Sequence, residues 1–193
     1  MGAIRSWAFF TASLLLTIFI VAAGCKQDEA PPPAAASAPA IEPAPLGEVA
    51  NVHRFGNIYL AGATNESDIA AIKAAGIERV VNIRLQDEYP FDESVACELA
   101  GLDYVALPFN SLESLTDEVF DRGRALLREG RDKPMLLHCG SANRAGVIWL
   151  AHRVLDGGLT FDAALAEARQ VGLRSNGLIE RARQYVEARA AAQ

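Results

Sequence analysis

Cys139 and Arg144 are the residues whose types and spacing most clearly suggest chemistry, because four residues separate them at the predicted junction of a strand and a helix. A loop that enters a helix N-terminus directs unpaired backbone N–H groups at one point, where the helix dipole favours negative charge. Such a field favours a thiolate, which is the nucleophilic form of cysteine. A guanidinium adds a planar fork of donors for phosphate or sulfate oxygens. The spacing therefore predicts a cysteine-based site for an oxyanion.

The roles predicted for this segment follow from its position in the loop. Cys139 is the expected nucleophile, and Arg144 is the expected clamp for the anion. The residues predicted to contact a bound substrate are those between them, together with one serine that follows an earlier strand: Gly140, Ser141, Ala142, Asn143 and Ser111.

The elements that position this site are predicted from the alternation of apolar runs and helical patterns. Strands are expected at 57–61, 79–84, 104–108 and 134–138, and the third of these is expected to be buried. Helices are expected at 67–75, 91–100, 116–130 and 144–155, and then after Thr160 and after Ser175. This order predicts an α/β domain with a mostly parallel sheet of four to five strands, flanked by helices. Ligands of such sheets bind beyond the carboxyl ends of the strands, where Cys139 falls.

The N-terminal segment, residues 1–24, has the pattern of an export signal. Arg5 precedes an apolar run over residues 7–23, which fits a signal better than a membrane span. The run ends in Ala22-Ala23-Gly24-Cys25, which resembles a bacterial lipobox. The resemblance implies cleavage before Cys25, lipidation of its thiol and export to the cell envelope. Lys26 favours the outer membrane, with the domain facing the periplasm.

Residues 25–50 are predicted to form a tether. Six Pro and six Ala fill most of the segment 31–45. This composition favours extended polyproline II and cannot bury a core. The following residues, 51–193, are numerous enough for one domain with its own core.

Composition argues against nucleic acid and metal ions as partners and leaves the role of Cys97 open. The chain has a formal net charge of −6, which argues against nucleic acid as the main partner. Its three His have no Cys or carboxylate at ligand spacing, so no metal or other cofactor is predicted. Cys97 is predicted to be a core residue beside Val95 and Leu99, with a redox partnership with Cys139 as the alternative.

The segment HCGSANRAG, with NIYLAG, VVNIR and YVALPF upstream, resembles the dual-specificity-type cysteine phosphatase superfamily. The closest branch is that of the bacterial beta-lactamase-hydrolase-like phosphatase domains, over residues 51–190. The resemblance implies their fold and the hydrolysis of phosphate monoesters through a phosphate bound covalently to Cys139. It implies that Arg144 and the loop amides hold the phosphate oxygens. The expected partner is a phosphorylated small molecule or a phosphoprotein.

Three features depart from the pattern of that superfamily. The loop between Cys139 and Arg144 has four residues where five are usual. Ala145 stands where a Ser or Thr is common. The general acid is usually an Asp after the strand that corresponds to YVALPF, and this chain has Asn110-Ser111 there. The carboxylates that could replace the missing acid are Glu113, Asp117, Asp87 and Glu88.

Two alternative functions remain open at this point. A Cys and an Arg with four residues between them are also typical of rhodanese-type sulfurtransferases, which would carry a persulfide on Cys139 and need no general acid. A binding module for anions or phosphorylated ligands would keep Cys139 and Arg144 without turnover. The phosphatase is the predicted function, and these are its alternatives.

Overall fold

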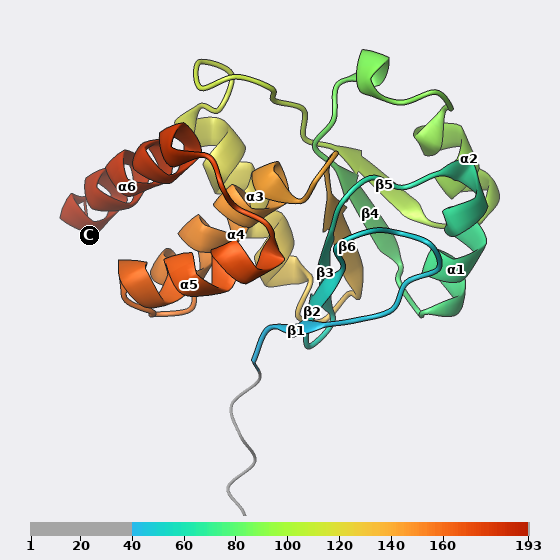
Figure 1. Cartoon of the computed structure of the whole chain (residues 1–193), viewed down its shortest axis with the longest axis horizontal. Helices are drawn as coiled ribbons and strands as arrows, with labels where there is room; N and C mark the ends of the chain where they lie inside the picture. Colours follow the sequence, from blue (N-terminus) through green and yellow to red (C-terminus); the bar gives the residue numbers. More distant parts are fainter. Residues whose placement is uncertain (1–39, 193) are drawn as a thin grey trace, which may run out of the picture. The chain divides into compact units, whose positions relative to one another are not determined.

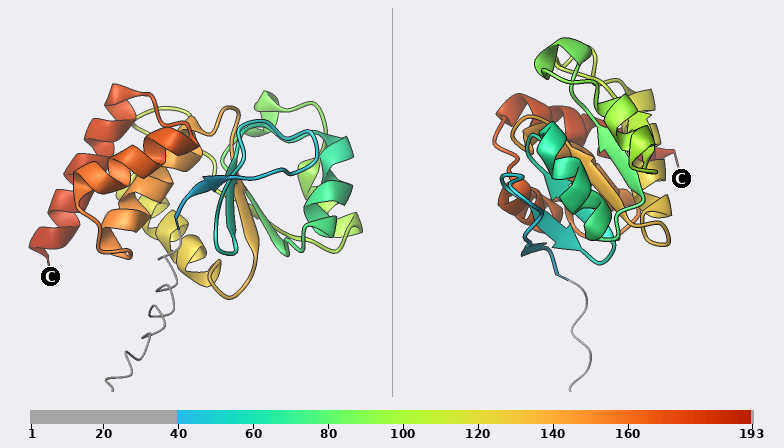
Figure 2. Two further views of the ribbon diagram at one scale, coloured as in Figure 1. Left: turned by 60° about the horizontal axis from the view of Figure 1, so that its bottom comes forward. Right: turned by 90° about the vertical axis from the view of Figure 1, so that its right-hand side faces the viewer.

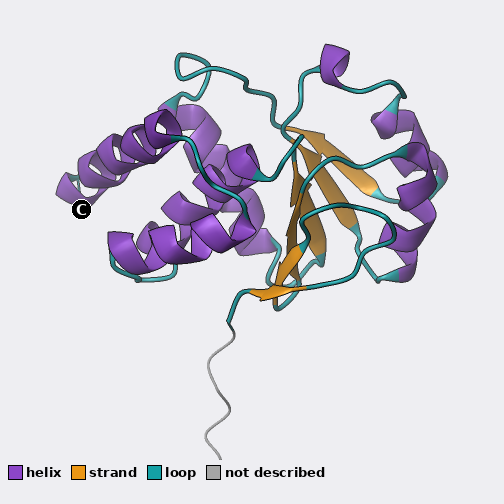
Figure 3. Cartoon of the chain, viewed as in Figure 1, coloured by secondary structure: helices purple, strands orange, loops and turns teal. Residues whose placement is uncertain are grey.

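A six-stranded sheet with helices on both faces forms the part of the chain that the structure, a computed structural model, describes (Figure 1, Figure 3). The described residues are 40–192. The expected export signal and Cys25 lie outside them. The predicted α/β architecture with a mostly parallel sheet is confirmed.

The strand order places the segment before Cys139 in the interior of the sheet. The strands are β1 (Glu42–Pro43), β2 (His53–Phe55), β3 (Ile58–Ala61), β4 (Arg79–Asn82), β5 (Asp103–Ala106) and β6 (Met135–His138). Their order is β1-β2-β3-β6-β4-β5, in which β3, β6, β4 and β5 are parallel and β1 and β2 are antiparallel. The sheet has more strands than the expected four or five because β1 and β2 are too short to give a periodic signal.

The helices form two layers, one on each face of the sheet (Figure 1, Figure 2). One layer contains α1 (Ile69–Ala74) and α2 (Glu93–Leu99). The other contains α3 (Asp117–Glu129), α4 (Asn143–Leu155), α5 (Phe161–Val171) and α6 (Asn176–Ala191). Two short 3-10 turns, η1 (Glu66–Asp68) and η2 (Gln86–Glu88), follow β3 and β4. The predicted caps are confirmed for α5 and α6, where the Thr160 and Ser175 side chains accept hydrogen bonds from backbone amides.

Helix α4, which follows the Cys139 loop, is the central helix of its layer. It is buried from Ala145 to His152, as its apolar composition predicts, and it packs against α3, α5 and α6. Its contact with α3 is close, because a Cβ added at Gly123 would lie 2.6 Å from Ile148 Cγ2. The buried helix therefore holds the loop at its N-terminus on a rigid support.

The strand predicted as the third buried one, β5, lies instead at an edge of the sheet. It pairs only with β4, and its two end residues are exposed while its two central residues are half-buried. The prediction of burial is wrong because a β-branched and aromatic sequence also fits an edge strand that one helix covers on one face.

The packed part of the chain begins before residue 51. Ile41, Leu46 and Val49 are buried, and β1, which lies in the segment expected to be a tether, pairs with β2 of the domain. Pro43 fits there because an edge strand tolerates a residue without an N–H donor. The body that carries the site therefore includes residues 41–49.

Within residues 40–192, no helix has the length and apolar character required to cross a membrane.

Candidate active site

Cys139 stands at the carboxyl end of β6, between β3 and β4. Its amide donates to the Ala61 carbonyl at 3.3 Å, and the Ile83 amide donates to the His138 carbonyl at 3.0 Å. The two neighbouring parallel strands thus fix the backbone on both sides of the thiol. This is the position that the sequence predicts for it.

The loop after Cys139 enters α4 through a left-handed turn. Ala142, the residue before the helix, has a φ of 65°, which is unusual for a residue with a side chain. The first helical hydrogen bond runs from the Gly146 amide to the Ala142 carbonyl at 2.8 Å. The amides of residues 143–145 precede that bond, so they have no carbonyl partner within the helix. They include the last two of the loop amides expected to hold an anion, those of Asn143 and Arg144.

Neighbouring segments hold the loop in place. The Gly140 carbonyl accepts from the Ala63 amide at 3.1 Å, and the Ser141 carbonyl accepts from Asn51 Nδ2 at 3.3 Å. Asn143 Oδ1 accepts from the amides of Arg174 and Ser175, at 2.8 and 3.2 Å. The Oδ1 atom of Asn143 therefore joins the loop to the α5–α6 connection, while Asn143 also lines the cavity beside Arg144.

The guanidinium of Arg144 is held at one end and unbonded along one edge. Nη1 donates to Glu88 Oε1 at 2.9 Å and to the Phe109 carbonyl at 2.8 Å, and Nη2 donates to Glu88 Oε2. Nε has no acceptor among the described residues, so Nε and the second hydrogen of Nη2 form a pair of parallel donors. A Cβ added at Gly140 would lie 3.8 Å from Nη2, so a glycine flanks this group.

Glu88 and Arg144 each stabilise the charged form of the other side chain. The hydrogen bond from Arg144 lowers the pKa of Glu88 below its ordinary value, despite the opposing effect of partial burial. Burial acts to lower the pKa of Arg144, but the hydrogen bond to Glu88 and the adjacent Cys139 outweigh it, and that pKa is raised. Both groups are therefore charged at neutral pH, and the guanidinium lies beside the thiol.

A cavity of about 500 Å³ opens at Arg144. Two of the predicted contact residues, Ser111 and Asn143, line it, while Cys139 is only 1 % exposed and is not part of the lining. Two of the four carboxylates considered as general acids line it as well, Asp87 and Glu88.

The other two carboxylates considered as acids are placed elsewhere. Asp117 pairs with Arg181 at 2.6 Å, and neither Asp117 nor Glu113 lines the cavity. The described part of the chain brings together no group of three or more His, Cys, Asp or Glu side chains that could hold a metal ion.

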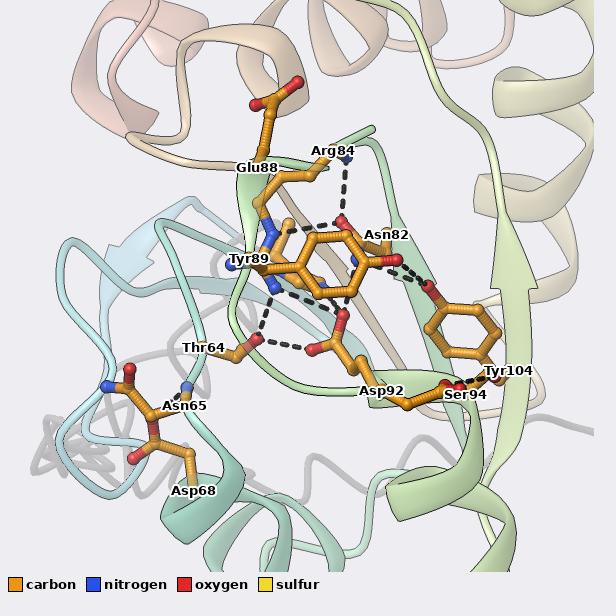
Figure 4. Close-up of polar contacts among 12 residues, drawn as sticks. Thr64, Asn65, Asp68, Asn82, Arg84, Glu88, Tyr89, Asp92, Ser94 and Tyr104 are labelled. Carbon is orange, nitrogen blue, oxygen red and sulfur yellow. Dashed lines mark hydrogen bonds and ion pairs between the residues drawn. The ribbon is translucent and has the colours of Figure 1, made fainter. Parts of the chain in front are cut away.

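A buried polar cluster, not anticipated from the sequence, lies beside the carboxyl ends of β4 and β6 (Figure 4). Its centre is Glu93, a fully buried carboxylate that accepts from Asn82 Nδ2 at 2.6 Å and from Arg84 Nη2 at 3.2 Å. The Thr64 hydroxyl donates to the other oxygen of Glu93. His138 Nε2 lies 3.3 Å from the same carboxylate. This cluster therefore contacts His138, the residue that precedes Cys139.

The same cluster supports the segment that carries Glu88. The guanidinium of Arg84 lies 4.6 Å from the centre of the Tyr89 ring, which is within the range of a cation–π contact. The Leu85 amide donates to Glu88 Oε1 at 3.1 Å. Figure 4 shows the Tyr89 ring beside the cluster and Glu88 pointing away from it. The buried cluster therefore supports the segment around η2, and the carboxylate of Glu88 extends from this segment to Arg144.

Cys97 and His152 are packed in the interior of the domain, away from the cavity at Arg144. Cys97 is buried with α1 and α2, and burial together with the charge of Glu93 raises its pKa to about 12. Cys139 belongs to the core on the α3–α6 face, and both thiols are free. The prediction of Cys97 as a core residue is confirmed. His152 packs in α4 with Nδ1 3.1 Å from Asp156 Oδ2.

No protein-family model matches the chain, and no curated protein sequence matches it.

Solved structures with a similar fold are phosphatases or candidate phosphatases. A candidate phosphatase of the DUF442 group from Shewanella putrefaciens aligns with a TM-score of 0.63 and 19 % identity, over 74 % of this chain and 95 % of that one. TpbA from P. aeruginosa, in complex with phosphotyrosine, aligns with a TM-score of 0.60 and 22 % identity, over 79 % and 91 %. The core catalytic domain of SIW14 from S. cerevisiae, a PP-IP phosphatase, aligns with a TM-score of 0.60 and 14 % identity, over 74 % and 91 %.

These likenesses establish the fold. The resemblance to cysteine phosphatases that the segment HCGSANRAG suggests is confirmed at that level.

Proposed function

We propose that this chain is a cysteine-dependent phosphatase that hydrolyses phosphate monoesters. The observation that carries the proposal is the arrangement of Arg144 beside Cys139, with its Nε–Nη2 edge unbonded within the described residues and the amides of residues 143–145 at the helix start. A phosphate group needs such a set of donors, in which a bidentate guanidinium and backbone amides surround its oxygens. The fold shared with known phosphatases supports the proposal.

The proposed reaction has two steps. In the first, the Cys139 thiolate forms a bond to phosphorus while the ester P–O bond breaks, and the leaving oxygen takes the electron pair and a proton. In the second, water attacks phosphorus, the S–P bond breaks, and inorganic phosphate leaves with the thiolate restored. Arg144 and the loop amides hold the three equatorial oxygens in both steps, and this electrostatic stabilisation is the main contribution of the protein.

The departures from the superfamily pattern bear on the first step. The place of the usual acid carries Asn110 and Ser111, and Ser111 lines the cavity without a carboxylate. A proton for the leaving oxygen then comes from water, which is sufficient when the leaving group is a phenol rather than an alkyl alcohol. The four-residue loop reaches α4 through the left-handed Ala142, which gives it a compact shape.

Turnover assays on the full-length chain in detergent test this proposal against its alternatives. We expect release of p-nitrophenol from p-nitrophenyl phosphate. Cys139→Ser should abolish it, and Arg144→Lys should reduce it at least about a hundredfold, because Lys lacks the planar fork. The matched control is Glu98→Gln, an exposed carboxylate on α2 outside the cavity, which should keep the wild-type rate.

Two results would contradict a phosphatase. Thiocyanate formation from thiosulfate and cyanide, without phosphate release, would indicate a sulfurtransferase. Binding of vanadate or sulfate without either reaction would indicate a binding module. Neither alternative is favoured by a contact in the described residues.

We further propose that Cys25 is lipidated and that the chain is anchored in the bacterial cell envelope, facing the periplasm. The sequence Ala22-Ala23-Gly24-Cys25 after an apolar run supports this proposal. We expect globomycin to block processing and Cys25→Ser to yield a form that fractionates without membranes. Membrane association that survives both treatments would contradict the proposal.

A further inference from the structure

The lining of the cavity at Arg144 carries more negative than positive charge. Arg144 is its single cation, while Asp87 and Glu88 contribute two carboxylates. Glu88 already pairs with the guanidinium. The residues between Cys139 and Arg144 add no cation, because they are Gly140, Ser141, Ala142 and Asn143. One phosphate group can therefore be held here, by the free donors of Arg144 and the loop amides, and a second negative group would find no further cation in the lining.

The nearby arginines do not change this balance. Arg181 is engaged with Asp117 at 2.6 Å and with the Leu115 carbonyl at 3.0 Å, and Arg84 is buried against Glu93. Arg174 contacts Asn143 through its backbone amide, and its side chain is not part of the lining. The chain as a whole has a net charge of −6, which adds a repulsive field for polyanions.

The rest of the lining is apolar or neutral. Leu112 is 46 % exposed at the cavity, and Phe109 and Leu178 line it too. An exposed leucine beside a site offers contact area to an apolar part of a ligand. The cavity thus combines one strong site for an oxyanion with an apolar wall and an unpaired carboxylate, Asp87, which has no hydrogen-bonding partner among the described residues.

We infer that this cavity selects esters that carry a single phosphate on an apolar group and whose neighbouring groups are neutral or cationic. Asp87 disfavours substrates with further negative charge. The inference rests on the proposed phosphatase function and specifies its substrate class. Asp87 acts here as a specificity-determining residue through its charge. Two unit charges a few ångströms apart at a wet surface interact by about 1 kcal/mol, which corresponds to about a fivefold change in affinity for each added charge.

Peptide binding to the full-length Cys139→Ser variant tests this inference without depending on turnover. The probes are two fluorescent phosphotyrosine peptides of one sequence, flanked by two Lys or by two Glu. We expect the Lys-flanked peptide to bind at least about tenfold more tightly at low ionic strength, with a smaller ratio at high salt because exposed charges are screened. Adding Asp87→Asn should reduce the ratio severalfold by improving binding of the Glu-flanked peptide. Adding Glu98→Gln should leave the ratio unchanged, because Glu98 is exposed on α2 outside the cavity.

A second arm uses small molecules that compete with the Lys-flanked peptide. Phenyl phosphate should displace the peptide at lower concentration than inositol hexakisphosphate. Tighter binding of the polyphosphate, or equal binding of the two peptides, would overturn the inference. An Asp87→Asn variant that weakens both peptides equally would overturn the role given to Asp87.

The outcomes also separate this inference from the proposed function. Charge-selective binding by the Cys139→Ser variant, combined with a wild-type chain that releases no phosphate, would overturn the phosphatase but support the selectivity. Efficient turnover of both peptides at one rate would support the phosphatase and overturn the selectivity.

Discussion

The carboxylate of Glu88 lies across the outer end of the Arg144 guanidinium, with Oε1 2.9 Å from Nη1, and leaves the edge formed by Nε and Nη2 without an acceptor among the described residues. The two donors of this edge, Nε–H and the second N–H of Nη2, stay available to an oxyanion. Glu88 therefore positions the guanidinium rather than competing with a substrate for it.

Replacing Glu88 tests this reading. Glu88→Gln should weaken vanadate binding about fivefold, since a half-exposed ion pair contributes at most about 1 kcal/mol. Competition would give the opposite sign, with vanadate bound more tightly by the variant. Inhibition of p-nitrophenyl phosphate turnover, or calorimetry if turnover is absent, measures the effect. Because the pKa of Glu88 lies below its ordinary value, the pair should persist at neutral pH and be lost only as the pH falls through that lowered pKa.

Glu93 should contribute to stability through its buried partners. Glu93→Ala would leave Arg84 and Asn82 without their acceptor and should lower the free energy of unfolding by about 3–5 kcal/mol. Urea denaturation measures it. Glu98→Ala, on the exposed side of the same helix, is the control and should cost less than about 1 kcal/mol. A loss no larger than that of the control would show that the cluster is not a stabilising unit.

His152 makes stability depend on pH in a defined window. Burial lowers its pKa to about 4, although Asp156 acts to raise it. The unfolded chain takes up a proton there below about pH 6.5, whereas the folded chain takes it up only below about pH 4. Stability should therefore fall as the pH decreases from 6.5 to 4, by a total on the order of 3 kcal/mol.

A variant without a titrating group at this position isolates that contribution. His152→Gln should show a flatter dependence of the unfolding free energy between pH 6.5 and 4.5, before most carboxylates titrate. Parallel curves for the variant and the wild type would refute a buried neutral imidazole.

Gly123 allows the close approach of α3 and α4. Ala at this position should raise helix propensity by about 1 kcal/mol, but its methyl group would meet the branched Ile148 side chain at 2.6 Å. Overpacking of this kind costs about 1–3 kcal/mol, so Gly123→Ala should lower the thermal midpoint. In a double-mutant cycle, the coupling of Gly123→Ala with Ile148→Ala should be favourable and larger than its coupling with Ile148→Val, which leaves Cγ2 in place.

The sequence predicts the α/β order and the strand–loop–helix around Cys139 because these depend on local patterns. The apolar strand before the cysteine, the capping residues Thr160 and Ser175 and the buried helix after Arg144 all give signals within a few residues. The edge position of β5 and the pairing of β1 depend on which strands become neighbours, and no local pattern encodes that.

The hydrogen-bonding partners of the site residues could not be predicted from the sequence, because they too depend on which segments become neighbours in the fold. Glu88 lies 56 positions before Arg144, and its role depends on how η2 is held. Glu93 looks like an ordinary acidic residue in the first turn of a helix, and only the packing of α2 against the sheet reveals it as buried. The sequence likewise gives no sign that Asn143 Oδ1 accepts from the amides of Arg174 and Ser175, about thirty positions further along the chain.

The packing of Ile41, Leu46 and Val49 onto the domain shortens any link to an acylated Cys25. The intervening residues 26–40 could stretch to roughly 50 Å at most, given about 3.5 Å per residue. A chain attached in that way would meet only molecules that come within a few protein diameters of the bilayer. The length of residues 26–40 would then limit which ligands the domain could meet, in addition to the selection made by the cavity itself.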